Sequence, residues 1–253
     1  MENMKQSLET LWQAKMNCLP SEIMRRLELE PLYTRNKQAP RYLVSGLGAD
    51  AMSAVFRQNI AEALRGKLFI DKPLNVFPDE TFELVILLWS LSTEKPQAIL
   101  SQVYRVLKRY GQCVLVTSFD SSPELPWAIL KNALRVCQKQ YQEKLQIYKS
   151  DLPQNAWQLR KIMSKIGLKD IQIWEDGVSY KYQDGNLLFN DLIRLSSGKI
   201  FHDSVASEIK INLRRKFCGL FDKMMDAAAE EVTNESTLGV EVVYSFAGAM
   251  GVK

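Results

Sequence analysis

The sequence predicts an α/β fold built on a mainly parallel sheet, and two observations lead to this prediction. The runs "ELVILLW" (83–89) and "QCVLVTSF" (112–119) are continuous apolar segments of strand length, as expected of parallel strands covered on both faces. Between them, residues 94–108 have the apolar spacing of a helix. Because a strand, a helix and a strand in close succession form a right-handed βαβ unit, we expect the two runs to lie side by side and parallel.

The ends of the helix at 94–108 carry recognisable signals. Ser92 or Thr93 can cap its N-terminus, and Pro96 stands in its first turn. Lys108, Arg109 and Gly111 are expected to close its C-terminal end.

The residues before this unit predict helices, a linker and further strands. Residues 5–28 have a helical pattern with a break at Leu19-Pro20, which predicts two short helices outside the sheet. A linker follows over 31–40, and "RYLVSGLGAD" (41–50) gives a short apolar run that ends in Gly-x-Gly. The pattern then predicts a helix over 51–66, followed at once by the strand "KLFID" (67–71).

The residues after the unit predict helices, with a strand between them and another at the end. The strands are "KDIQIWED" (169–176) and "VEVVYSFAGAMGV" (240–252), and the second is expected to join the same sheet antiparallel. The helices are predicted over 126–148, 155–168, 185–198 and 204–232. We therefore divide the chain into N-terminal helices (1–40), a cofactor-binding core (41–120) and helical lid insertions with the C-terminal strands (121–253).

Composition and charge exclude several classes of protein. The net charge of +4 arises from 33 basic and 29 acidic residues spread along the chain, which does not indicate a nucleic-acid partner. The four cysteines lie far apart, and the only histidine, His202, has no metal-ligating neighbour, so we expect no metal site and reduced thiols. Since no apolar run is long enough for a membrane helix and no signal segment is evident, we expect a cytoplasmic protein.

Residues 77–119 resemble the centre of class I S-adenosylmethionine-dependent methyltransferases. "FPDETFELV" (77–85) matches the pattern that precedes the family's fourth strand, and "RVLK" (105–108) matches the end of the next helix. The match departs where the family has Pro-Gly-Gly and this chain has Arg109, Tyr110 and Gly111. The order of the later elements is similar to methyltransferases of type 11, including the malonyl-acyl-carrier-protein methyltransferase subgroup.

The resemblance implies a Rossmann-like class I methyltransferase sheet with helical lid insertions, shortened by one strand-helix unit. From Tyr42 to the strand at 83–89 there are only about forty residues, whereas a βαβ unit takes roughly 30 or more. The run at 41–50 is compatible with the family's first strand, with Asp50 at the third glycine. It is equally compatible with the second strand, with Gly48 in place of the ribose-binding acid.

The resemblance also implies S-adenosylmethionine as cofactor and suggests the residues that bind it. Gly46 and Gly48 form the candidate glycine turn, although an ordinary turn would also use glycine. Asp71, followed by Lys72, falls where counting back from residues 77–79 places the adenine-contacting aspartate, and capping of the loop is its competing role. Trp89 and Ser90 stand at the carboxyl end of a predicted strand, where open sheets bind ligands, but core packing and helix capping would also explain them.

Two functions follow from this sequence. The first is methyl transfer from S-adenosylmethionine to a small-molecule or acyl-carrier-bound acceptor, for which no catalytic residue can be named. The alternative is a catalytically inactive methyltransferase-like protein that binds a protein partner in assembly. The basic cluster of Lys210, Arg214, Arg215 and Lys216 is either a solvated helix face or a docking site for an acidic carrier.

Overall fold

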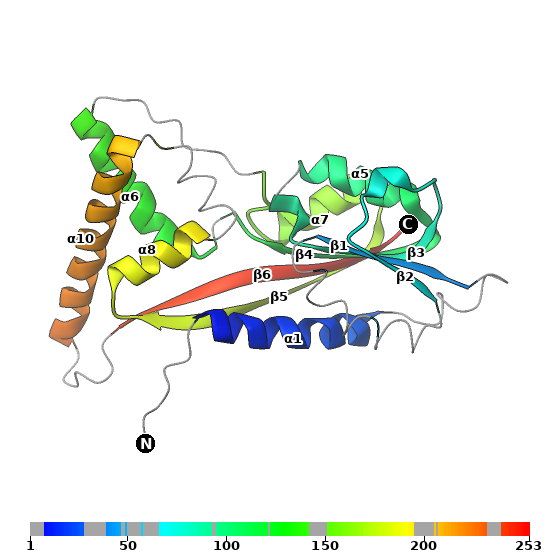
Figure 1. The fold of residues 1–253 in the computed structure, drawn as a ribbon, viewed down its shortest axis with the longest axis horizontal. Helices are drawn as coiled ribbons and strands as arrows, with labels where there is room; N and C mark the ends of the chain where they lie inside the picture. The colour runs from blue at the N-terminus through cyan, green and yellow to red at the C-terminus, as the bar shows by residue number, and fades with distance from the viewer. Residues whose placement is uncertain are drawn as a thin grey trace, which may run out of the picture. The chain divides into compact units, whose positions relative to one another are not determined.

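The computed structural model describes residues 8–27, 39–46, 49, 57, 66–92, 95–120, 122–141, 151–194, 205, 207–231 and 239–253 (Figure 1). The chain forms two compact units. The first comprises residues 1–119, 151–178 and 246–253, and the second comprises residues 120–150 and 179–245.

A sheet of six strands runs through the described residues. The strands are β1 (Arg41–Gly46), β2 (Lys67–Ile70), β3 (Phe82–Leu88), β4 (Leu107–Ser118), β5 (Lys169–Tyr182) and β6 (Val240–Val252), in the order β2-β1-β3-β4-β6-β5. The β1–β2, β1–β3 and β3–β4 pairs are parallel, and β6 joins β4 antiparallel. Both strand-pairing predictions are therefore confirmed, and the fold is the predicted α/β sheet.

The order of the strands shows where residues 41–50 lie. β1 pairs with β3 on one side and with β2 on the other. β1 is therefore an interior strand, and β2 is an edge strand of the described sheet. No strand lies beyond β2 among the residues that the structure describes.

The two faces of the sheet are covered by different helices (Figure 1). Leu84, Ile86 and Leu88 of β3 point into a core that includes residues of α1 (Leu8–Arg26). Val85 and Leu87 point to the opposite face, which is covered by α5 (Pro96–Val106) and α7 (Ala156–Lys165). Because successive side chains of a strand alternate between faces, coverage on both faces explains the uninterrupted apolar run.

The N-terminal segment forms one helix where the sequence predicted two. α1 continues through Pro20, which lacks the N–H that would donate to the carbonyl of Met16. An interior proline costs a helix about 3 kcal/mol, but burial of a Leu or Ile side chain contributes about 1.5–3 kcal/mol. Leu19 and Ile23 are fully buried and Met16 nearly so. Packing against the sheet therefore outweighs the proline.

The ends of α5 also differ from the prediction. Its N-cap is Lys95 without a side-chain hydrogen bond, so Ser92 is not the cap, and Thr93 lies outside the described residues. Pro96 stands in the first turn, as predicted. The helix ends at Val106 and β4 begins at the next residue, so Gly111 lies in the strand and does not close the helix.

The second unit contains α6 (Glu124–Tyr141), α8 (Gly185–Arg194) and α10 (Ser207–Glu231), together with the ends of β5 and β6. Tyr182 of β5 is fully buried, and its hydroxyl donates to Asp191 Oδ2 of α8 at 2.8 Å. The same hydroxyl lies 2.6 Å from the hydroxyl of Tyr244 in β6. Burial, reinforced by these two contacts, raises the pKa of Tyr182 well above its ordinary value.

Candidate functional site

The strand order defines where a ligand would bind. From β1 the chain passes to β2 on one side, and β3 then lies on the other side of β1. Such a switch point leaves a crevice at the carboxyl ends of the strands, and open α/β sheets bind ligands there. The residues at these ends are Gly46, the last residue of β1, Asp71 after β2, and Trp89 and Ser90 after β3.

The surrounding residues of this chain require glycine at position 46, whether or not a ligand binds nearby. Its φ is +110°, in a region that favours glycine. A Cβ atom at this position would lie 2.1 Å from the carbonyl oxygen of Leu88 and 2.4 Å from Ser90 Oγ. Its carbonyl accepts a hydrogen bond from the N–H of Ala49 at 3.0 Å, which closes a turn at the end of β1. Gly46 is thus explained by this turn and by the close approach of β3.

Asp71 presents an exposed carboxylate at this edge of the sheet. Its N–H donates to the carbonyl of Val44 at 2.8 Å, which extends the pairing of β2 with β1 by one residue. Its Oδ1 accepts a long hydrogen bond of 3.4 Å from the N–H of Gly46. The carboxylate therefore keeps most of its acceptor capacity for a ligand. Lys72 follows it and is also exposed.

The side chain of Trp89 packs in the core. It is 9% exposed, and its ring centroid lies 6.1 Å from that of Trp12 in α1 and 6.1 Å from that of Phe246 in β6. The backbone N–H of Trp89 donates to the carbonyl of Val116 at 2.7 Å. Only its backbone belongs to the candidate site, and the packing interpretation of this tryptophan holds.

Ser90 is buried and begins a short 3-10 helix, η3 (Ser90–Ser92). Its hydroxyl donates to the carbonyl of Leu88 at 3.4 Å. Ser90 lies close to Gly46, because a Cβ atom added to Gly46 would be 2.4 Å from Ser90 Oγ. The structure thus brings these two residues together.

Three neighbouring strands end at a residue with positive φ. These residues are Gly46 at +110°, Asp71 at +46° and Trp89 at +49°. For a residue other than glycine, this conformation costs about 1–3 kcal/mol and persists where the surrounding structure enforces it. Positive φ also occurs at Glu80, Tyr110 and Asp170, so this conformation does not by itself mark the carboxyl edge as the functional one.

Other candidate residues are not part of this site. Gly48 and His202 lie outside the described residues. No group of acidic residues, cysteines and histidines suitable for a metal ion occurs in the part of the chain that the structure describes. All four cysteines are free thiols, and burial raises the pKa of Cys113 to about 12.

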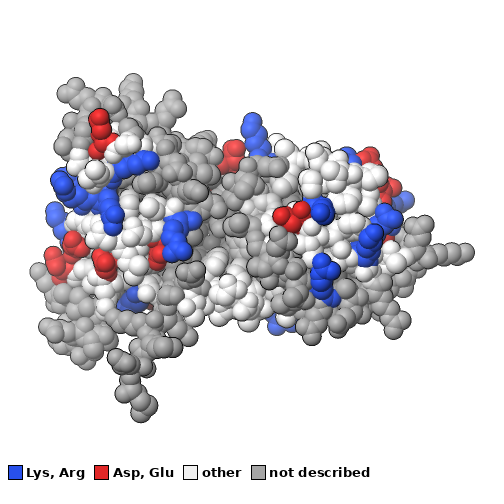
Figure 2. Space-filling view, viewed as in Figure 1, with Lys and Arg blue, Asp and Glu red and all other residues white. Residues whose placement is uncertain are grey.

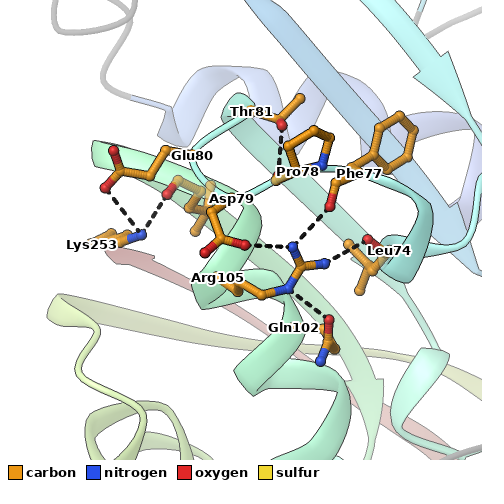
Figure 3. A network of polar contacts seen from close by, with 10 residues as sticks. Leu74, Phe77, Pro78, Asp79, Glu80, Thr81, Gln102, Arg105 and Lys253 are labelled. Carbon is orange, nitrogen blue, oxygen red and sulfur yellow. Dashed lines mark hydrogen bonds and ion pairs between the residues drawn. The ribbon is translucent and has the colours of Figure 1, made fainter.

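The most recognisable motif of the sequence forms a structural clamp (Figure 3). The guanidinium of Arg105 in α5 donates to the carbonyl of Phe77 at 2.8 Å, to the carbonyl of Leu74 at 3.0 Å and to Asp79 Oδ1 at 2.7 Å. Its Nε donates to Gln102 at 2.9 Å. These contacts fix residues 74–79 on α5 just before β3 begins. The clamp is at the amino end of β3, about 20 Å along the strand from Trp89.

A second polar contact ties the amino ends of three strands together. Glu83 of β3 is buried, and its Oε2 accepts from the N–H of Arg41 in β1 at 2.7 Å. Its Oε1 accepts from Lys108 Nζ of β4. With the Arg105 clamp, this contact stabilises the amino edge of the sheet. The sequence motif signals the fold more directly than it signals a binding site.

Sequence and structure comparisons give different results. No protein-family model matches the chain, and no curated protein matches its sequence. Its fold is similar to solved structures, among them YcgJ from Bacillus subtilis, at 12% identity and a TM-score of 0.47 over 92% of this chain and 98% of that one.

Two further structures share the fold. A protein from Bacillus halodurans described as a methyltransferase has 12% identity and a TM-score of 0.49 over 92% of this chain and 98% of that one. Phosphoethanolamine N-methyltransferase 2 of Haemonchus contortus, in complex with S-adenosylhomocysteine, has 12% identity and a TM-score of 0.44 over 100% and 59% of the two chains. At this identity the similarity concerns the fold alone.

None of the described helices is long and apolar enough to cross a membrane.

Proposed function

We propose that this protein binds S-adenosylmethionine over the carboxyl ends of β1, β2 and β3, and transfers its methyl group to a small-molecule or carrier-bound acceptor. The observation that carries the proposal is the exposed Asp71 carboxylate beside the switch point. A carboxylate in this place can accept hydrogen bonds from the two hydroxyls of a ribose.

The strand order changes the role that the sequence suggested for Asp71. Counting back from residues 77–79 assigned it to adenine. Because β2 lies directly beside β1, Asp71 instead follows the strand in the second position. In the class I methyltransferases that the sequence resembles, the acid in that position binds the ribose hydroxyls. We therefore propose Asp71 as the ribose-binding residue.

The shortened sheet lowers the expected affinity. The family's adenine-contacting aspartate follows a third strand, which has no counterpart among the six described strands. The loss of a hydrogen bond to a charged acceptor costs about 1.5–3 kcal/mol, which corresponds to roughly one to two decades of affinity. We expect binding weaker than a complete site would give.

One observation favours the inactive alternative. Trp12 of α1 packs against Trp89 at the carboxyl end of β3, with ring centroids 6.1 Å apart. An N-terminal helix that fills this edge would serve a protein retaining the fold without the cofactor, because an unfilled cavity costs stability. The two functions are separated by whether S-adenosylmethionine binds at all.

Calorimetric titration of the whole chain with S-adenosylmethionine and S-adenosylhomocysteine tests the proposal. We expect both to bind, and Asp71→Asn to weaken binding by about 10- to 100-fold. Asp151→Asn, which changes an exposed acid in a loop of the same unit, is the matched control and should bind like the original chain. No heat and no thermal shift at millimolar ligand would reject the enzyme and favour the inactive protein.

A further inference from the structure

The outer surface of α10, in the second unit, is hollowed. Ile211, Arg214, Arg215, Cys218, Gly219 and Asp222 of α10, with Asn186 of α8, line a depression of about 580 Å³. Ile211 is 69% exposed, which is unusual for a large apolar side chain. A Cβ atom at Gly219 would meet nothing within 4 Å. The floor of the depression is therefore open backbone beside an exposed apolar group.

Charges are distributed unevenly along this helix. Its first half contains four basic residues and one acidic residue, and its second half contains four acidic residues and one basic residue; these are Lys210, Arg214, Arg215, Lys216 and Glu208, and then Asp222, Asp226, Glu230, Glu231 and Lys223. Figure 2 shows, on its left side, a group of Lys and Arg with Asp and Glu both above and below it. The helix dipole favours acidic residues near the N-terminus and basic residues near the C-terminus, so it accounts for Glu208 in the first turn but not for the rest of this order.

We propose that this surface pairs with the same surface of a second copy of the chain, with the two α10 helices antiparallel and Gly219 at the crossing point. The proposal is independent of whether the protein binds S-adenosylmethionine. Gly219 stands midway between Ser207 and Glu231. A two-fold axis at the middle of a helix makes the surface self-complementary, as a symmetric dimer requires.

The helical rise sets which residues then face each other. At about 1.5 Å per residue, Arg215 lies about 6 Å from Gly219 in one direction, and Asp222 lies about 4.5 Å from it in the other. In an antiparallel partner Asp222 is therefore level with Arg215 to within about 1.5 Å. Lys216 and Lys223 reach similar levels, but neither of them lines the depression. The pairing creates two equivalent Arg215–Asp222 contacts, whereas a parallel pairing would set Arg215 against Arg215.

The lack of a side chain at Gly219 supports the crossing. Packed helices lie about 8–10 Å apart, depending on the side chains at the contact. A glycine at the crossing permits the short end of this range. Ile211, one turn beyond Arg215, would then lose its exposure to water. Arg214 Nε donates a hydrogen bond of 3.0 Å to Asn186 Oδ1. This bond holds the guanidinium of Arg214 beside the proposed contact between the two helices.

The interface is expected to be weak because it consists of one helix pair. Stable interfaces bury about 1,200–2,000 Å² in total, and a single helix pair lies at or below that range. The appropriate measurement is sedimentation equilibrium up to about 100 µM, where a dimer with a dissociation constant of about 10 µM is mostly formed. The original chain should sediment as a monomer–dimer equilibrium.

Charge reversal gives a specific test of the pairing. Arg215→Glu alone would set Glu against Asp222 twice, and Asp222→Arg alone would set Arg against Arg215 twice. Each variant should weaken dimerisation at least about tenfold. A mixture of the two variants should restore it, because a dimer with one of each contains two attractive contacts. Lys131→Glu, at an exposed position of α6 in the same unit, is the matched control and should dimerise normally.

Cross-linking gives an independent measurement. Cys218 is partly exposed and lies one residue from the proposed axis. In a Cys18→Ser background, a short bis-maleimide should link two copies through Cys218, and Arg215→Glu should abolish the link. Circular dichroism would establish that each variant is folded.

A monomeric original chain at about 100 µM would overturn the proposal, since a dissociation constant of about 10 µM predicts mostly dimer there. A dimer that persists unchanged in both charge variants, or a mixture that fails to recover dimerisation, would also overturn it. Binding of an acidic peptide from another protein, with no self-association, would assign the surface to a different partner and refute the dimer.

Discussion

Replacing Arg105 tests whether the clamp holds the loop before β3. In Arg105→Ala the carbonyls of Leu74 and Phe77 lose a charged donor in a partly buried place. A hydrogen bond to a charged group contributes about 1.5–3 kcal/mol when buried, which we discount to about 1 kcal/mol each because the Arg105 side chain is 29% exposed. Asp79 is 74% exposed, so its ion pair adds less than about 0.5 kcal/mol.

The expected loss for Arg105→Ala is therefore about 2–3 kcal/mol, or roughly 4–10 °C in the melting temperature of a chain of this length. Urea unfolding followed by tryptophan fluorescence measures the loss in the free energy of unfolding. Thermal melts followed by circular dichroism measure the change in melting temperature. Asp79→Ala removes only the ion pair and should cost less than about 1 kcal/mol. Arg105→Lys keeps the charge without the planar fork and should fall between the two. An equal loss for Asp79→Ala and Arg105→Ala would refute the role given to the carbonyls.

Three further outcomes follow from the structure. Gly46→Ala should lose more than about 3 kcal/mol in urea unfolding, because its Cβ would meet the Leu88 carbonyl at 2.1 Å in a strained conformation; a loss under about 1 kcal/mol would contradict the geometry. Because burial raises the pKa of Tyr182 above its ordinary value of 10, the unfolded chain releases this proton first as pH rises. The free energy of unfolding should therefore be unaffected by this group below pH 10 and should fall above pH 10 by about 1.4 kcal/mol per pH unit. If the dependence of the free energy of unfolding on pH is the same in Tyr182→Phe as in the original chain, the effect is excluded. Iodoacetamide followed by mass spectrometry should label exposed Cys18 rapidly and Cys113 only after unfolding; early labelling of Cys113 would show that β4 opens.

The central strands could be predicted from the sequence because strands buried on both faces consist mainly of apolar residues. Residues 84–88 of β3 and 113–116 of β4 are apolar without interruption, and the structure buries all of them. β6 was predicted to join antiparallel from its length and β-branched residues, and it does. In these cases the local pattern and the tertiary environment agree.

The errors occur where tertiary contacts override a local signal. Pro20 ordinarily ends a helix, but the buried side chains around it keep α1 continuous. Gly111 ordinarily closes a helix, but β4 starts directly after Val106, and Tyr110 takes the positive φ of +66°. Neither the packing around Pro20 nor the start of β4 after Val106 can be predicted from the neighbouring residues in the sequence.

The candidate site was predictable in part. Gly46, Asp71, Trp89 and Ser90 all stand at carboxyl ends of strands, as the sequence indicated. The neighbour of β2 in the sheet could not be deduced, because distance along the chain does not specify strand order. The pairing with β1 is the reason that we propose ribose binding, and not adenine binding, for Asp71. The helix predicted over 51–66 lies almost wholly outside the described residues.

The place of β6 in the sheet has a consequence for how the protein is made. β6 lies between β4 and β5, yet it is the last of the three to be synthesised. Its neighbours in space are remote in sequence, since Lys253 Nζ and the carbonyl of Leu107, joined at 2.7 Å, are 146 residues apart. Until β6 emerges from the ribosome, β4 and β5 each have an unpaired edge, and such edges promote aggregation. Pairings of this range also fold slowly. A nascent chain stalled before residue 240 should therefore depend on chaperones more than the finished chain does.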